Sequence, residues 1–186
     1  MQVLEETTKK RTSKQGIIML IKKSLASLTT QCVALAFLVS FFALPALAKD
    51  ELNWRAVPTY TTVDLRAGFT PDPWTQELQA GGSTRVPSHL GSDCVGLVHA
   101  SAPDVDLNYT AGSFNLYIHV ESSADTTLVI YGPDRRWYCN DDAIGLNPMV
   151  VFNNPPSGNY NIWVGTYDSG NLRPATLKIT EIDPRR

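Results

Sequence analysis

The chain has 186 residues, of which 43% are hydrophobic and 18% charged, and its formal net charge is −2. These values are typical of a globular protein and exclude a disordered, collagenous or coiled-coil chain. The charge is unevenly divided, because residues 1–48 hold six basic and two acidic side chains, which leaves 10 basic and 16 acidic side chains for residues 49–186. An acidic globular part without a cluster of Lys and Arg argues against a nucleic-acid partner.

The first 48 residues have the order of a targeting segment. A short basic stretch begins at Met19, the apolar run 33–44 and Pro45 follow, and small residues stand at Ala46 and Ala48. This order predicts a signal peptide over residues 1–48, with Met19 as the true start and cleavage after Ala48. A transmembrane anchor is the alternative, but this run of twelve residues, apolar except for Ser40, is shorter than the roughly 20 residues that span a bilayer. We expect a secreted or periplasmic protein with no membrane contact after cleavage.

Two cysteines, Cys94 and Cys139, follow the predicted cleavage point. An even number of cysteines in an oxidising compartment favours a disulfide. A metal pair and two free thiols are the alternatives, but no Cys-x-x-Cys or Cys/His spacing supports a metal. In the chain-entropy model a crosslink over this loop stabilises the fold by about 4 kcal/mol.

Residues 49–186 are long enough for one domain, with a loose N-terminal arm over residues 49–58 and a folded part over residues 59–186. Short alternating segments with Gly, Pro, Asn and Ser between them indicate strands rather than helices. In residues 114–120 the alternation places Leu116, Ile118 and Val120 on one face together with Phe114. We expect an all-β, antiparallel, jelly-roll-like β-sandwich of about eight strands, over residues 60–65, 74–80, 95–99, 114–120, 127–131, 149–152, 160–165 and 175–181.

Four segments from residue 103 onward resemble, in their order and spacing, the bacterial pre-peptidase C-terminal (PPC) domain. They are Pro103-Asp-Val-Asp-Leu-Asn-Tyr109, Asp125-Thr-Thr-Leu-Val-Ile-Tyr-Gly-Pro-Asp134, Cys139-Asn-Asp-Asp142 and Pro156-Ser-Gly-Asn-Tyr-Asn-Ile-Trp-Val-Gly165. The resemblance implies a secreted β-sandwich that stands alone here, of a kind usually appended to proteases, and in some members acidic loops bind calcium. Residues 49–100 are not covered and are expected to add strands and one half of the disulfide.

Five polar residues are candidate metal ligands. Asp104 and Asp106 project to one side of an extended backbone, and Asn140, Asp141 and Asp142 follow a strand that ends near Cys139. If the sandwich brings the two segments together, their oxygen atoms suit Ca²⁺, which takes six to eight oxygen ligands. The alternative is turn chemistry, since Asp and Asn hydrogen-bond locally to turn backbone. A glycosidase pair of carboxyl groups is a further alternative, although no apolar pocket that would raise one pKa is evident.

Aromatic side chains are the second candidate feature. Trp163 and Tyr167 share one face of a strand whose other face carries Tyr160, Ile162 and Val164. If the latter face is the core, Trp163 and Tyr167 form an outward platform for sugar rings or for a protein partner. The alternative is that Trp163 only covers a sandwich edge. Trp137 shares parity with Cys139 and is expected to pack against the disulfide.

Catalytic motifs do not emerge from the sequence. A serine protease needs a base beside an activated Ser and an acid that orients the base, and neither a Gly-x-Ser-x-Gly elbow nor an HExxH, P-loop or dinucleotide pattern occurs. The histidines are His89, His99 and His119, the last two within expected strands. We therefore expect a non-catalytic binding or accessory module that contacts an extracellular polysaccharide or protein. A secreted hydrolase and a purely structural envelope protein are the alternatives.

Overall fold

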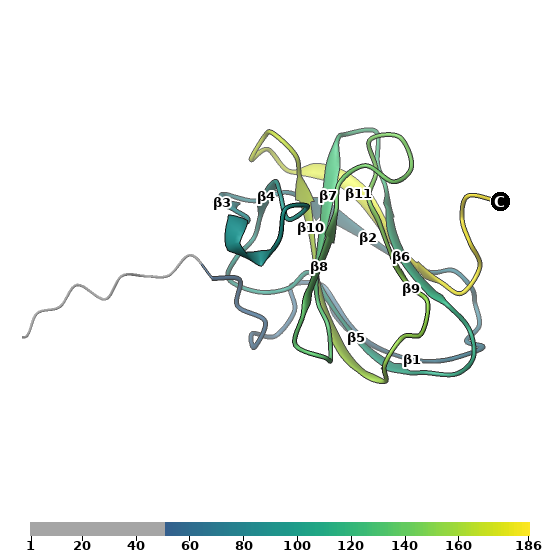
Figure 1. The fold of residues 1–186 in the computed structure, drawn as a ribbon. Helices are drawn as coiled ribbons and strands as arrows, with labels where there is room; N and C mark the ends of the chain where they lie inside the picture. Colours follow the sequence, from purple (N-terminus) through teal and green to yellow (C-terminus); the bar gives the residue numbers. More distant parts are fainter. Residues whose placement is uncertain (1–50) are drawn as a thin grey trace, which may run out of the picture. The chain divides into compact units, whose positions relative to one another are not determined.

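Eleven β-strands and one 3-10 turn build residues 51–186, the part of the chain that the computed structural model describes (Figure 1). The strands are β1 (Thr61–Arg66), β2 (Trp74–Ala80), β3 (Thr84–Arg85), β4 (Leu97–Val98), β5 (Val105–Thr110), β6 (Leu116–Glu121), β7 (Thr126–Tyr131), β8 (Trp137–Asn140), β9 (Met149–Phe152), β10 (Gly158–Thr166) and β11 (Arg173–Thr180), and the turn η1 is Ser88–Leu90. None of the described residues forms a helix long and apolar enough to cross a bilayer. The predicted signal peptide and its cleavage site lie outside the described residues.

The strands form two sheets. The seven-stranded sheet has the order β1-β5-β10-β4-β3, with β7 pairing with β10 and β8 pairing with β7, and the four-stranded sheet has the order β2-β11-β6-β9. β1 runs parallel to β5, with Thr61 beside Val105 and Arg66 beside Thr110, and the other pairs are antiparallel. The predicted β-sandwich is confirmed, and β1 is an exception to its antiparallel pairing.

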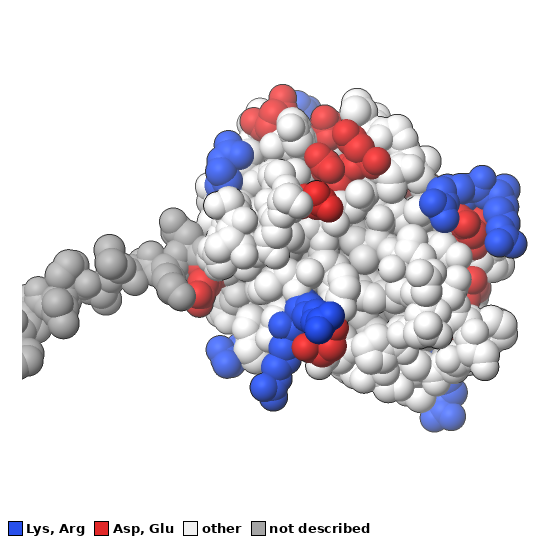
Figure 2. Space-filling view, viewed as in Figure 1, with Lys and Arg blue, Asp and Glu red and all other residues white. Residues whose placement is uncertain are grey.

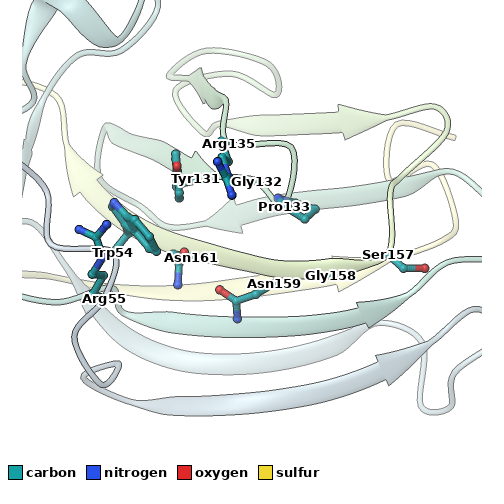
Figure 3. Close-up of a pocket in the computed structure, with 10 residues that line it drawn as sticks. All are labelled: Trp54, Arg55, Tyr131, Gly132, Pro133, Arg135, Ser157, Gly158, Asn159 and Asn161. Atoms are coloured by element: carbon teal, nitrogen blue, oxygen red, sulfur yellow. The ribbon is translucent and has the colours of Figure 1, made fainter.

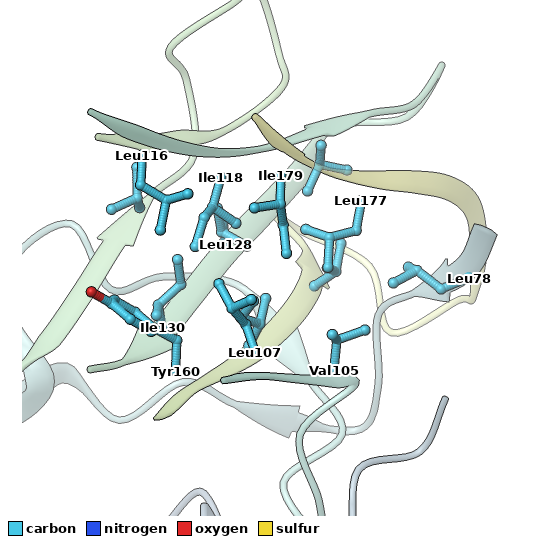
Figure 4. Close-up of a cluster of buried hydrophobic side chains, with 14 of the residues drawn as sticks. Leu78, Val105, Leu107, Leu116, Ile118, Leu128, Ile130, Tyr160, Leu177 and Ile179 are labelled. Atoms are coloured by element: carbon cyan, nitrogen blue, oxygen red, sulfur yellow. The ribbon is translucent and has the colours of Figure 1, made fainter. Parts of the chain in front are cut away.

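The main core lies between the two sheets (Figure 4). Strand alternation builds it, because Val105, Leu107 and Tyr109 of β5 are buried on the inner face while Asp106 and Asn108 lie on the outer face. The four-stranded sheet contributes the opposing side chains Leu116, Ile118, Leu177 and Ile179, all fully buried. Burial of each such aliphatic side chain stabilises the fold by about 1.5–3 kcal/mol.

A second buried cluster lies on the outer face of the seven-stranded sheet, over β10 and β7. Its buried members are Leu52, Val86, Cys94, Val98, Val129 and Trp163. Residues 51–58 and 82–100 supply the outer half of this cluster, and we call these two segments the cover. The expected loose arm is therefore packed where it is described, since Leu52 is buried and the amide of Asn53 donates to the carbonyl of Ala100 at 2.9 Å.

The disulfide between Cys94 and Cys139 joins the cover to β8, as the sequence predicted. Trp137 packs in the same cluster as both cysteines, also as expected. A glycine in β10 allows the close approach, because a Cβ at Gly165 would lie 2.4 Å from Thr127 Oγ1 and 2.8 Å from the carbonyl oxygen of Leu97. Any larger residue at Gly165 would push the cover off the sheet.

Candidate binding site

A row of four aromatic side chains crosses the outer face of the seven-stranded sheet. Ring centroids lie 5.0 Å apart between Trp54 and Tyr131, 4.8 Å between Tyr131 and Trp137, and 5.7 Å between Trp137 and Trp163. All three pairs are tilted, an arrangement that aromatic rings favour. The row runs from the buried Trp163 to the half-buried Trp54, which reaches the surface.

The predicted platform of Trp163 and Tyr167 does not form. Trp163 does lie on the face opposite Tyr160, Ile162 and Val164, but the cover leaves it 0% exposed, whereas Tyr167 is 46% exposed. A ligand in solution therefore cannot stack on Trp163. The accessible end of the aromatic row is Trp54, which the sequence analysis did not single out.

A groove of about 700 Å³ opens beside Trp54 (Figure 3). Trp54 and Arg55 of the cover stand at one end, and Ser157 lies toward the other end. The turn between β7 and β8 forms one side, and β10 contributes two amide side chains to the lining. Its lining is Trp54, Arg55, Tyr131, Gly132, Pro133, Arg135, Ser157, Gly158, Asn159 and Asn161, a mixture of aromatic, cationic and amide groups without a carboxylate.

Hydrogen bonds on the outer face hold the amides of β10 in place. Asn161 Nδ2 donates to Asp106 Oδ1 at 2.7 Å. Asn159 Nδ2 donates to Asn108 Oδ1 at 2.9 Å, and Asn108 Nδ2 donates to Asp64 Oδ1 at 2.9 Å. These bonds run across β10, β5 and β1, so the polar side chains beside the groove are fixed by their neighbours.

A second hollow of about 640 Å³ continues from the groove over β1 and β5. The two share Ser157, Gly158 and Asn159 as lining. The second hollow also has Asp64 and Arg66 in its lining. The two hollows therefore adjoin one another on the outer face of β10, β5 and β1.

Two arginines enter the groove from different segments. The guanidinium carbon of Arg55 lies 4.0 Å from the ring centroid of Trp54, a cation–π contact. Arg135 is exposed and is the one residue other than glycine with a positive φ, 65°, among residues 51–186. Its amide donates to the carbonyl of Gly132 at 3.0 Å, which closes the turn between β7 and β8.

The structure places Asp104 directly before β5 and Asp106 within it. Asp104 is 4% exposed, and its Oδ2 accepts from the amide of Val164 at 2.7 Å. Burial raises the pKa of Asp104 to about 7, and the hydrogen bond from Val164 opposes that rise. Burial also raises the pKa of Asp106, which the bond from Asn161 opposes. Both carboxyl groups therefore accept hydrogen bonds from residues of the neighbouring strand β10.

The other three predicted ligands lie elsewhere on the same sheet. Asn140 ends β8 and its Oδ1 accepts from the amide of Met149 at 2.9 Å, and Asp141 and Asp142 follow it. Strands β10 and β7 lie between this segment and Asp104, so the fold does not bring the two acidic segments together. Residues 51–186 contain no group of three or more His, Cys, Asp or Glu side chains placed to share a metal ion.

Asp141 and Asp142 belong instead to an acidic end of the molecule. Figure 2 shows acidic side chains gathered at the top of the view. Burial, and then the charges of Asp142, Asp168 and Asp141, raise the pKa of Asp125. The charges of these three carboxyl groups therefore act on Asp125 at the end of the sandwich where β7 begins and β10 ends.

The histidines lie on separate parts of the fold. His119 of β6 is 3% exposed, and its Nδ1 has no hydrogen-bond partner. Burial lowers its pKa, as expected for a neutral structural histidine. His89 in η1 and His99 after β4 are exposed on the cover. None of the three lines the groove.

The chain matches no protein-family model and no curated protein. Solved structures similar to it include the following two. The pre-peptidase C-terminal domain of a collagenase from Bacillus anthracis is 15% identical with a TM-score of 0.41, over 67% of this chain and 98% of that one. PliG from Aeromonas hydrophila, a periplasmic inhibitor of g-type lysozyme, is 13% identical with a TM-score of 0.32, over 64% of this chain and 96% of that one. Neither likeness shows a family or a function for this chain.

Proposed function

We propose that the chain is an exported, non-catalytic binding module and that the groove beside Trp54 holds its ligand, an extended extracellular polysaccharide. The observation that carries the proposal is the composition of the groove, in which aromatic, arginine and fixed amide side chains meet on one open surface. Such side chains supply the apolar faces and the hydrogen bonds that hydroxyl-rich ligands need. The predicted signal peptide and the disulfide support export, because disulfides persist in oxidising compartments.

The continuous shape of the site favours a polymer over a small ligand. The groove and the second hollow share three residues and together cross β10, β5 and β1. Both hollows are lined by residues of the outer sheet face and its turns, so a chain of several sugar rings could lie along them without threading.

The test is retardation of the purified protein in native gels that contain a neutral polysaccharide, dextran or mannan, or an acidic one, polygalacturonate. We expect retardation by at least one of them. An Asn159→Trp variant, which fills the junction of the two hollows, is expected to lose it. Thr75→Trp, on the exposed side of β2 in the other sheet, is the matched control and keeps it. No retardation by any polymer, or equal retardation of the Asn159→Trp variant, would refute the proposed function.

The same incubation separates binding from the alternative of a secreted hydrolase. We expect no release of reducing ends from a bound polymer, since the groove lining contains no carboxyl group and the second hollow has Asp64 alone, whereas a glycosidase needs a pair of carboxyl groups. The purely structural alternative predicts assembly in size-exclusion chromatography without any soluble ligand. If reducing ends were released in proportion to the polymer bound, the protein would be a hydrolase and the proposed non-catalytic role would be wrong.

Calcium binding stays a separate prediction. Since β10 and β7 separate the two acidic segments, any effect of Ca²⁺ would come from one segment rather than from all five predicted ligands. Thermal unfolding in EDTA and in excess Ca²⁺ decides it, and equal midpoints would end the calcium hypothesis.

A further inference from the structure

We propose that the polysaccharide in the groove is acidic and that Arg55 and Arg135 bind its carboxylate groups. This inference rests on the proposed function and narrows it to sugars of the uronic-acid class. It is carried by two arginines that line one groove from two distant segments of the chain. Arg55 lies on the ring of Trp54, and Arg135 has a left-handed backbone conformation.

Arg55 is held against an aromatic ring rather than by an acid. Its guanidinium lies 4.0 Å from the centroid of Trp54, and Trp54 is itself packed on Tyr131 at 5.0 Å. A guanidinium that stacks on an indole keeps the N–H groups along its edge free, and that edge matches a carboxylate with two parallel hydrogen bonds. Arg55 is exposed, so its edge is accessible to a ligand.

Arg135 occupies a backbone position that favours glycine. Its φ of 65° lies in the left-handed region, which a side chain with a Cβ adopts only at an energetic cost. Glycine would close the turn between β7 and β8 without that cost. Residues in strained backbone conformations cluster at functional sites, and here the side chain is an arginine in the lining of the groove.

Charge pairing separates these two arginines from their neighbours. No salt bridge involves Arg55 or Arg135 within residues 51–186, whereas Arg136, the next residue in the turn, lies 3.9 Å from Asp134. The groove lining contains no Asp or Glu, although residues 49–186 carry 16 acidic and 10 basic side chains. Two arginines without an acid in the lining of the groove suit a ligand that carries negative charge. Asp64 lines only the second hollow, where Arg66 shares the lining.

The remaining lining favours a sugar over a peptide or a nucleic acid. Asn159 and Ser157 are exposed polar groups suited to hydroxyls, and Pro133 and Tyr131 offer apolar faces for ring C–H groups. A nucleic acid would need a broad basic surface, which the acidic composition does not provide. An acidic peptide would pair with the two arginines, but its acidic side chains have no hydroxyl groups for the amide side chains of β10 to bind.

The experiment compares two forms of one polymer. Binding of the purified protein to polygalacturonate and to its fully methyl-esterified form is measured by isothermal titration, with poly-L-glutamate as the acidic peptide probe. The two polysaccharides share a backbone and differ in carboxylate charge. We expect the esterified polymer to bind at least about tenfold more weakly, the loss that corresponds to one or more charge-assisted hydrogen bonds.

Three variants assign the effect to the groove. Arg55→Ala and Arg135→Gly are each expected to weaken binding of polygalacturonate by about tenfold. Arg136→Ala removes the same charge one residue away, outside the groove lining, and is expected to change it less than about twofold, below the tenfold loss of one such hydrogen bond. Arg135→Gly also relieves the left-handed backbone position, so its melting temperature should be unchanged or raised, which excludes misfolding as the cause of lost binding.

Each other outcome overturns the inference in a recognisable way. Equal affinity for the esterified and the acidic polymer would reject the acidic class while the proposed binding function stands. Equal losses in Arg136→Ala and Arg135→Gly would show attraction by general charge rather than by the groove. Tighter binding of poly-L-glutamate than of polygalacturonate would replace the polysaccharide by a peptide and would refute the proposed function as well.

Discussion

Asp104 shows how one buried residue can couple stability to pH. Its carboxyl group is 4% exposed and has a pKa of about 7, against 3.8 in an unfolded chain, because burial disfavours the charged form. The folded state therefore keeps a proton that the unfolded state releases. The stability that Asp104 contributes is complete below about pH 4 and is lost as the pH rises toward 7.

An Asp104→Asn variant tests this coupling. The amide side chain would keep an oxygen acceptor for the backbone N–H of Val164 but would have no charge to bury. We expect the variant to be more stable than the wild type at pH 8, by up to about 4 kcal/mol, and the difference to shrink toward pH 4. Urea unfolding at both pH values measures it.

The comparison with the wild type at each pH is needed because His119 acts in the opposite direction. Burial lowers the pKa of His119, so its contribution is complete above its ordinary pKa and is lost as the pH falls. Both proteins contain His119, and its effect cancels in the difference. A difference between the two proteins that is constant from pH 4 to pH 8 would contradict the assigned pKa of Asp104.

At the same scale, the residues of the groove show what local sequence patterns miss. Alternation correctly assigned Trp163 to the face opposite Tyr160, but exposure depends on the cover, which comes from residues far away in the chain. Trp54 lies in what was expected to be a loose arm, and no periodicity marks it. The position of Arg135 is marked in the sequence, because it follows the turn residues Gly132-Pro-Asp. In such a hairpin turn glycine is usual at the left-handed position that Arg135 occupies.

At the scale of elements, the cover is the part that sequence patterns described least. The main strands were predictable because apolar residues recur along them, alternating in β6, β10 and β11 and consecutive in β7. β3 and β4 have only two residues each, too few for a period to appear. β5 was not predicted as a strand, because its Asp and Asn residues resemble loop residues until the outer face of the sheet is known.

The disulfide is the link that holds the cover on the sheet, and its removal gives a prediction for this scale. A Cys94→Ser/Cys139→Ser variant is expected to lose about 2–5 kcal/mol of unfolding free energy. It should also expose Trp137 and Trp163, whose cluster the cover completes. Urea unfolding measures the first effect, and quenching of tryptophan fluorescence by acrylamide measures the second.

Reduction of the wild-type protein with dithiothreitol is the control, because it opens the same bond without a substitution. We expect the two samples to behave alike. If fluorescence quenching stays unchanged in both while stability falls, the cover packs without its crosslink, and the disulfide then stabilises the chain without holding this segment in place.

At the scale of the whole molecule, charge is divided between two regions. The acidic end contains Asp125, Asp141, Asp142 and Asp168, and the groove contains two arginines without an acid. A ligand that meets only two arginines releases few counterions. We therefore expect its affinity for polygalacturonate to fall by no more than about tenfold between 50 and 200 mM salt, whereas a general polyanion binder with many contacts loses about a thousandfold or more. Titrations at the two salt concentrations measure the fall, and a steeper one would indicate contacts well beyond the groove.

The position of β10 sets which part of the molecule opens last. Its backbone is paired on one side with β5 and on the other with β7, and aromatic or aliphatic side chains shield it above and below. Deuterium from solvent should reach the amides of Ile162, Trp163 and Val164 only when the entire domain unfolds. Their exchange rates would then report global stability directly, while amides in β1 and β2, at the two sheet edges, exchange through smaller local fluctuations.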